Sequence, residues 1–204
     1  MADKHVLLVE GKDDVHVFYH LLKHHHIPDL FKIKCKDGYE NLRNTLEVEL
    51  LASDLERLGV VVDANASLAS RWQSLQSVLS NSGYDVPTTP DPDGTIIQHR
   101  GRPTVGIWIM PDNTLPGMLE NFVAFLIPPG DPLWACAGDC LEQIPEQHRR
   151  FPAIHQPKAH IHTWLAWQEE PGAPMGQAIT KRYLDAEASH AHQLMDWIRR
   201  LFEI

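Results

Sequence analysis

Acidic side chains follow three apolar runs in this sequence. Glu10 comes after Val6–Val9, Asp63 comes after Val60–Val62, and Asp112 comes just after Ile107–Met110. Short apolar runs of this kind predict strands that are buried on both faces of a parallel sheet. The carboxyl ends of such strands form the working edge of the sheet, so we expect the three acids to meet there.

Two further acids can join this group. Asp14 lies one helical turn after Glu10, and Glu120 lies in the helix expected after the last of these strands. Gathered carboxylates repel one another, and Mg²⁺ or Mn²⁺ is the usual remedy because hard cations prefer oxygen ligands. Such an ion polarises a phosphoryl oxygen and lowers the pKa of a bound water. The residues therefore predict a Mg²⁺ or Mn²⁺ site suited to phosphodiester chemistry.

The same acids have a plain structural alternative, which is to cap helices. Asp14 and Asp63 both stand where a cap is expected, and for either residue alone we favour that role. Glu10 differs, because a charged side chain between an apolar run and Gly11 is costly unless something compensates its charge. The group as a whole is stronger evidence for a metal site than any one of its members.

Strands and helices are expected to alternate along the chain. Strands are expected at 6–9, 31–35, 60–62 and 107–110, with a helix after each, and further helices at 134–144, 158–167 and 188–202. Thr95–Ile97, inside a proline-rich insertion at about residues 85–105, could pair with the last strand as a hairpin or an edge. We expect an α/β core in residues 1–130 and a helical C-terminal part, residues 131–204, packed on it.

The composition is that of a globular protein, with 43% hydrophobic and 22% charged residues among 204. No run approaches the roughly 18 apolar residues that a membrane span needs, so no membrane association is expected. The three cysteines form no dense disulfide framework, which favours reduced thiols and a cytoplasmic location. The formal net charge of −9 argues against a non-specific grip on long nucleic acid but leaves room for a local basic groove.

Two other groups could bind metal by residue type. Cys136 and Cys140 are four apart in an expected helix, but a zinc site needs two more ligands and none lies at regular spacing nearby. His24, His25 and His26 lie at the expected end of a helix, where cations suit the helix dipole. We therefore interpret the histidine run as a helix end.

Two segments resemble the motifs of a known superfamily. Residues 9–14, Val-Glu-Gly-Lys-Asp-Asp, resemble the glutamate motif that opens Toprim domains, and residues 61–65, Val-Val-Asp-Ala-Asn, are similar to their Asp-x-Asp motif. The resemblance implies a Toprim-like, mostly parallel sheet flanked by helices, with a helical C-terminal extension. It also implies that Glu10 and Asp63 coordinate Mg²⁺ for cleaving or joining phosphodiester bonds. Asn65 replaces the second aspartate, which keeps one oxygen ligand but removes a charge and should weaken the site.

Two later segments, 106–122 and 158–166, are similar to a little-characterised Toprim-like group related to OLD-family nucleases. This likeness implies that Asp14 and Glu120 are further metal ligands, and Asp112 or Glu120 could restore the charge missing at Asn65. By its position, Lys158 resembles the late lysine that stabilises charge on the phosphate in those nucleases. On residue type alone, Lys158 is as well explained as a solvated lysine at the start of a helix.

Three functions compete on these grounds. The first is a metal-dependent nuclease acting on DNA or RNA by water attack. The second is a non-catalytic metal- or nucleotide-binding module in a larger assembly, which Asn65 and the acidic net charge favour. In the third, the acids only cap helices and the chain is an interaction partner. Nucleic acid is the partner expected for a nuclease, and a separate ATPase and a second copy of the chain in a homodimer are the protein partners considered.

Overall fold

The computed structural model of the chain describes residues 4–204, which form one five-stranded sheet and eight α-helices. The strands are β1 His5–Val9, β2 Lys32–Cys35, β3 Arg57–Asp63, β4 Thr95–Ile97 and β5 Thr104–Met110. The helices are α1 Lys12–His24, α2 Tyr39–Leu50, α3 Leu68–Asn81, α4 Leu119–Ala124, α5 Pro132–Glu142, α6 Gln156–Leu165, α7 Met175–Thr180 and α8 Ser189–Phe202. Two 3₁₀ turns, η1 Glu146–His148 and η2 Ala153–His155, lie between α5 and α6.

The sheet has the strand order β2-β1-β3-β5-β4. Strands β2, β1, β3 and β5 are parallel, and β4 pairs antiparallel with β5 at the edge. The expected α/β fold with a mostly parallel sheet is therefore confirmed. Val9 is in register with both Cys35 and Val61, so β2, β1 and β3 run to the same edge of the sheet. This edge receives whatever residues follow each strand.

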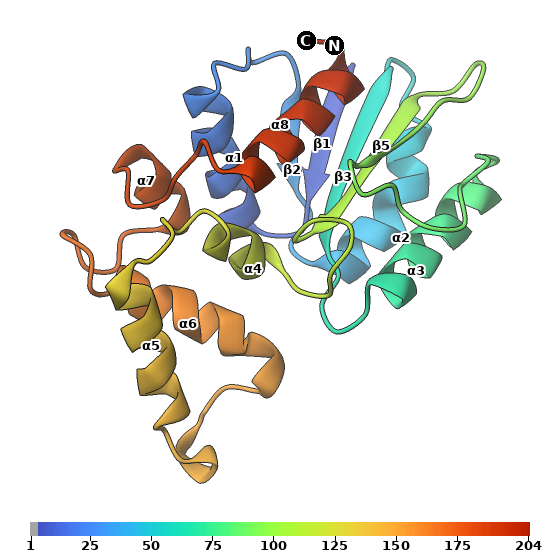
Figure 1. Cartoon of the computed structure of the whole chain (residues 1–204). Helices are drawn as coiled ribbons and strands as arrows, with labels where there is room; N and C mark the ends of the chain where they lie inside the picture. Colours follow the sequence, from blue (N-terminus) through green and yellow to red (C-terminus); the bar gives the residue numbers. More distant parts are fainter. Residues whose placement is uncertain (1–3) are drawn as a thin grey trace.

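Helices cover both faces of the sheet and give a three-layer structure (Figure 1). Alternate strand residues supply the two cores: Leu7 and Val9 pack with α1, α4 and α8, while Val6 and Leu8 pack with α2 and α3. Burial on both faces explains why these strands are continuous apolar runs in the sequence.

Two glycines let α8 approach the sheet closely. Gly59 on β3 is in register with Gly106 on β5. A Cβ atom on Gly106 would lie 2.5 Å from Cδ2 of Leu201, and one on Gly59 would lie 3.1 Å from the same atom. Leu201 is fully buried in α8. The last turn of α8 therefore packs directly against the backbone of the two glycines.

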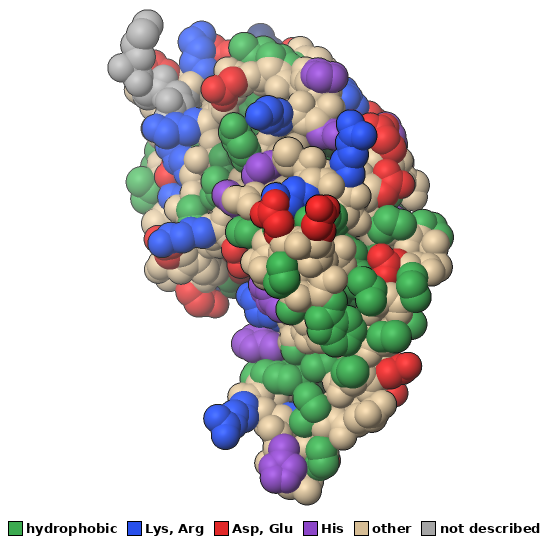
Figure 2. Space-filling view, turned by 90° about the vertical axis from the view of Figure 1, so that its left-hand side faces the viewer, with side chains coloured by type: hydrophobic (Ala, Val, Ile, Leu, Met, Phe, Trp, Pro, Cys, Tyr) green, Lys and Arg blue, Asp and Glu red, His purple; other side chains and the backbone are tan. Residues whose placement is uncertain are grey.

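The C-terminal helices divide into two groups. Helix α7 lies against α1, where His20 Nδ1 is 2.6 Å from Thr180 Oγ1, and α8 lies on the sheet. Helices α5 and α6 extend away from the sheet (Figure 1). The Trp134 ring of α5 stacks on the His160 ring of α6. Hydrophobic side chains gather on this lower part of the molecule (Figure 2). Leu133 in α5 and Trp167 just after α6 are both exposed. None of the helices in residues 4–204 is both long enough and apolar enough to span a membrane.

Some local predictions need correction. Gly11, not an aspartate, is the N-cap of α1, and Asp14 lies three residues later. Helix α4 covers only Leu119–Ala124, although the sequence predicts a helix over residues 117–127, and residues 125–126 form a turn. Helix α7 was not expected at all. The spacing of Trp164 and Trp167, three residues apart, predicts that both lie in the core, but only Trp164 is buried and Trp167 is 40% exposed. The pairing of β4 with β5 is as expected.

Candidate functional site

A cleft lies at the edge of the sheet to which the parallel strands run. Its lining comes from the residues after β1, β2 and β3, the start of α1, the start of α4 and the region where η2 meets α6. These lining residues are Glu10, Gly11, Lys12, Asp13, Asp14, Asp37, Gly38, Asp63, Asn65, Met118, Leu119, Glu120, His155 and Lys158. The structure thus brings six of the seven predicted site residues together: Glu10, Asp14, Asp63, Asn65, Glu120 and Lys158.

Glu10 and Asp63 are fixed by backbone groups of neighbouring segments. Glu10 Oε1 accepts a hydrogen bond from the backbone N–H of Asp63 at 2.8 Å. Asp63 Oδ1 in turn accepts one from the backbone N–H of Leu119, the first residue of α4, at 2.9 Å. One oxygen of each carboxylate therefore holds two neighbouring segments of the cleft together. The second oxygen of each has no hydrogen-bond partner among residues 4–204.

The other two predicted acids lie at helix starts. Asp14 Oδ2 accepts a hydrogen bond from the backbone N–H of Gly11 at 2.9 Å, so it does act as a cap. Glu120 in α4 is almost fully buried, and its Oε1 lies 2.9 Å from Nζ of Lys158 in α6. A buried charge of this kind needs a partner, and Lys158 provides it.

Three carboxylates of the cleft, Asp63, Asp14 and Glu10, have a raised pKa, chiefly because they are buried. Burial raises the pKa of Asp63 well above its ordinary value, and the charges of Asp14, Glu10 and Glu120 raise it further. Burial also raises the pKa of Asp14 to about 7, with Glu10 and Glu120 adding to the rise and the hydrogen bond from Gly11 opposing it. The pKa of Glu10 is raised by burial, against the hydrogen bond from Asp63. Each charge in the group is therefore costly without a cation.

Lys158 is the main positive group at the buried end of this cluster. Burial alone would lower its pKa, but the hydrogen bond and the negative charge of Glu120 outweigh burial, and the pKa lies above its ordinary value. Asp13 and Asp63 act in the same direction. Lys158 therefore carries a positive charge at neutral pH while about half of its side chain is exposed to the cleft.

The acids line the same cleft, but their carboxylate oxygens do not all lie close to one common point. Among the described residues, no three of these carboxylates place ligand oxygens within 4.8 Å of one another. Mg²⁺ fits such an arrangement better than a cation that needs a closed cage, because it keeps several waters and takes only one or two carboxylates directly. The donor set, which is all oxygen, suits Mg²⁺ or Mn²⁺.

Asn65 lies in the cleft in a left-handed conformation with φ of 53°. Its backbone N–H and C=O pair with those of Gly117, at 2.7 and 2.8 Å, which ties the segment after β3 to the segment before α4. Asparagine is one of the residues that adopt this conformation most readily. Its side-chain amide makes no hydrogen bond with the described residues, so it is available to a ligand.

Asp112 does not lie in the cleft. It is buried after β5, and its Oδ1 accepts hydrogen bonds from the backbone N–H groups of Thr114 at 2.9 Å and Leu115 at 2.8 Å. A carboxylate used twice by its own loop stabilises a turn. We therefore remove Asp112 from the predicted ligand set.

Four charged or titratable residues of the cleft were not predicted: Lys12, Asp13, Asp37 and His155. Asp37 lies two residues after β2, so the strand-end rule could have found it, but Asp37 and Gly38 form an Asp-Gly pair, which is equally typical of a plain turn. Lys12 and Asp13 line the cleft because they are the first two residues of α1, which begins there. His155 lies in a 3₁₀ turn that the sequence did not predict.

Comparisons with known proteins identify a family but no characterised relative. No curated protein matches the chain, and no solved structure matches it. The family described as "Protein of unknown function (DUF3226)" matches residues 4–203, nearly the whole chain. The chain belongs to the DUF3226 family.

Proposed function

We propose that this protein is a divalent-metal-dependent nuclease that hydrolyses phosphodiester bonds in DNA or RNA, as its Toprim-like and OLD-like segments imply. One observation supports this most: Glu10, Asp14, Asp63 and Glu120 come from separate segments and line one cleft beside Lys158. Acids used only as caps have no need to converge, and mutual repulsion makes convergence costly.

The roles of the residues follow from their positions. Glu10, Asp14, Asp63 and Glu120 would hold Mg²⁺ or Mn²⁺, with Asn65 adding an amide oxygen. When bound, such an ion supplies Lewis-acid polarisation of a phosphoryl oxygen and a water of lowered pKa. Lys158 holds the buried charge of Glu120 on one side and offers positive charge to a phosphate oxygen on the other.

The first turn of α1 adds a second attraction for phosphate. Helix N-termini favour anions, because the first backbone N–H groups and the helix dipole are directed toward them. Helix α1 begins at Lys12, which lines the cleft. Six carboxylates oppose two lysines among the lining residues, so phosphate should enter only when a dication offsets part of the negative charge.

Asn65 favours a second candidate function, a non-catalytic metal- or nucleotide-binding module that works in a larger assembly. A neutral amide in place of a carboxylate lowers the affinity for a dication and the charge that it can balance. The exposed apolar side chains Leu133 and Trp167 at α5 and α6 give such a module a surface for a separate ATPase or a second copy of the chain. For either function we propose a cytoplasmic location, where the three free cysteines stay reduced.

A cleavage assay with Mn²⁺ on single- and double-stranded DNA and RNA tests the nuclease proposal. Wild-type protein should cleave at least one substrate only when metal is present. Glu10→Gln should reduce cleavage by at least about tenfold, because it removes a ligand charge yet keeps the Oε1 that accepts from Asp63. Glu47→Gln, on the exposed surface of α2 and outside the cleft, is the matched control and should cleave normally.

The outcomes separate the two functions. Metal-independent cleavage, or equal cleavage by Glu10→Gln and wild type, would contradict the proposed site. Mn²⁺ binding that depends on Glu10 without cleavage of any substrate would support the binding module. Absence of both binding and cleavage would leave the carboxylates as structural groups only.

A further inference from the structure

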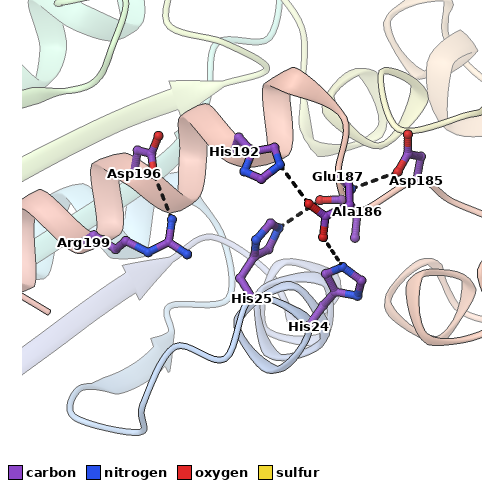
Figure 3. Close-up of polar contacts among 8 residues, drawn as sticks. All are labelled: His24, His25, Asp185, Ala186, Glu187, His192, Asp196 and Arg199. Carbon is purple, nitrogen blue, oxygen red and sulfur yellow. Dashed lines mark hydrogen bonds and ion pairs between the residues drawn. The ribbon is translucent and has the colours of Figure 1, made fainter.

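A second group of potential metal ligands lies away from the cleft, between α1 and α8 (Figure 3). His25 directly follows α1, Glu187 precedes α8, and His192 lies in its first turns. One ligand atom from each of these residues lies within 4.8 Å of the others. Within residues 4–204 this is the only group of three acids, histidines or cysteines that meets this distance.

The carboxylate of Glu187 organises the group. His192 Nε2 lies 2.9 Å from Glu187 Oε2, and His24 Nε2 lies 2.6 Å from Glu187 Oε1. The His25 ring packs edge-on against His192, with ring centroids 5.1 Å apart. Figure 3 shows the His24 and His192 rings joined to the Glu187 carboxylate, and the His25 ring joined to the neighbouring carbonyl oxygen of Ala186. Two helices that are far apart in sequence thus present nitrogen and oxygen donors to a common point.

A backbone carbonyl group also orients the His25 ring. Its Nε2 lies 2.9 Å from the carbonyl oxygen of Ala186. A metal ion bound at Nε2 would replace this hydrogen bond. A metal ion bound at Nδ1 would leave the hydrogen bond in place, and the hydrogen bond would then fix the orientation of the ring. In the neutral imidazole, Nε2 carries the hydrogen that it donates to this carbonyl, and Nδ1 keeps a lone pair for a metal ion.

We infer that His25, Glu187 and His192 form a binding site for a transition-metal ion, with Zn²⁺ as the best match. Imidazole suits Zn²⁺, Cu²⁺ and Ni²⁺, and two histidines with one glutamate are an established type of donor set for Zn²⁺. His24 holds the other oxygen of Glu187 and orients the carboxylate. The fourth position is left for water or a small ligand.

The donor chemistry distinguishes this site from the cleft. The residues that we assign to metal in the cleft are acids and an amide, whose oxygen atoms suit Mg²⁺ or Mn²⁺, whereas imidazole nitrogen is preferred by Zn²⁺. A site of this kind would join the C-terminal end of α1 to the start of α8. It does not depend on the proposed nuclease activity.

Calorimetric titration of metal-free protein with Zn²⁺ tests the site. The exposed thiols Cys136 and Cys140 should first be changed to serine in all variants, so that they do not bind the metal. The parent should bind one Zn²⁺ tightly. His25→Ala and His192→Ala should each weaken binding by at least about tenfold, and Glu187→Gln should weaken it while keeping the shape of the side chain.

Two matched controls accompany these variants. His26→Ala removes an exposed neighbour of His25 that does not belong to the group, and it should leave the affinity unchanged. Asp63→Asn alters the cleft and should also leave it unchanged. Glu187 and His192 are well exposed, so their variants should fold, and circular dichroism checks this.

Visible spectra of the Co²⁺-substituted protein give a second readout. Intense tetrahedral bands that disappear in His192→Ala would support direct coordination. Zn²⁺ affinities that are equal in parent, His25→Ala and His192→Ala would overturn the inference and leave an ordinary hydrogen-bonded histidine cluster. So would a parent that does not bind Zn²⁺.

Discussion

Nζ of Lys158 lies 2.9 Å from Oε1 of Glu120, and this ion pair joins α6 to α4 at the buried end of the cleft. The two partners are unequal, since Glu120 is 4% exposed and Lys158 is 46% exposed at the side chain. Lys158 therefore serves as the built-in counterion of a carboxylate that we assign to metal binding. A bound metal ion and the Lys158 ammonium group should therefore compete for the Glu120 carboxylate.

Lys158→Met tests this competition. Removing the lysine should tighten Mn²⁺ binding, because Glu120 is freed for the ion, yet it should lower cleavage, because the charge offered to phosphate is lost. In EDTA the variant should lose about 1–3 kcal/mol of unfolding free energy, since a buried carboxylate loses its partner. Calorimetry, cleavage assays and urea unfolding measure the three effects. Lys12→Met, at the same cleft but with no ion pair to any residue in the range 4–204, is the control. Weaker Mn²⁺ binding in Lys158→Met would contradict the competition.

Asp63→Asn should make the metal-free protein more stable. The pKa of Asp63 is raised well above its ordinary value by burial and by the charges of Asp14 and Glu10, so the folded state is destabilised at neutral pH. Asparagine keeps the oxygen that accepts from Leu119, and the free energy of unfolding in EDTA should rise by about 1 kcal/mol or more.

The same variant should lose the rise in melting temperature that Mn²⁺ gives to wild-type protein. Thermal unfolding with EDTA and with Mn²⁺ measures both effects. Asp112→Asn makes the same chemical change outside the cleft and should retain the metal-induced rise. A destabilised Asp63→Asn that still responds to Mn²⁺ would refute the role given to Asp63.

Asn65→Asp should strengthen metal binding. The added carboxylate supplies a charge to the cleft, and aspartate also tolerates the left-handed backbone at this position. Mn²⁺ affinity should rise by about tenfold, or about 1.4 kcal/mol. Cleavage should rise with it if the protein is a weakened nuclease. Titration of both proteins decides the matter: equal affinities would mean that Asn65 does not contact the ion.

Glu49 gives a pH dependence that is separate from the cleft. Its carboxylate lies 2.6 Å from Lys36 Nζ and 3.2 Å from Lys34 Nζ. Burial would raise the pKa of Glu49, but the hydrogen bonds and charges of the two lysines outweigh burial and lower it below its ordinary value of 4.5. The contacts of Glu49 with the two lysines therefore stabilise the fold at pH values above the ordinary pKa of 4.5. This stabilisation is lost as the pH falls through the lowered pKa of the folded state.

Urea unfolding from neutral pH down to about pH 3 measures this effect. Glu49→Gln should lower the free energy of unfolding by about 1 kcal/mol at neutral pH and flatten the acid limb of the profile. Glu47→Gln, two residues earlier and exposed, should retain the wild-type profile. An acid limb that is identical in wild type and Glu49→Gln would show that the lysine contacts contribute nothing.

Gly106→Ala should destabilise the protein by about 1–3 kcal/mol through overpacking. The new Cβ atom would lie 2.5 Å from Leu201 Cδ2. In a Leu201→Ala background the same change should cost much less, because the clashing methyl groups are absent. A double-mutant cycle by chemical denaturation measures this coupling. Additive effects would show that α8 does not rest on Gly106.

The sequence predicted the site best where a residue directly follows a buried strand. Glu10 and Asp63 were placed correctly, since β1 and β3 are continuous apolar runs whose ends are easy to recognise. Asp112 follows β5 in the same way but is turned into its own loop by two backbone hydrogen bonds. Local turn chemistry overrides the strand-end rule there, and hydrophobic pattern carries no information about it.

Contacts between distant segments were the other limit. The fold class could be predicted because alternating strands and helices have few possible arrangements. Helix α7 is only six residues long and carries no periodic pattern of its own. His25 looked like part of a helix end, because its partners Glu187 and His192 lie in a part of the chain about 160 residues further on.

Helix α1 begins at the cleft and ends at the histidine cluster. Its 13 residues span about 20 Å, so a single helix sets the distance between the cleft and the histidine cluster. Between these two ends, the buried side chains Val17, Phe18 and Leu21 anchor the middle of α1 in the core, so the spacing of the two candidate metal sites is built into the fold.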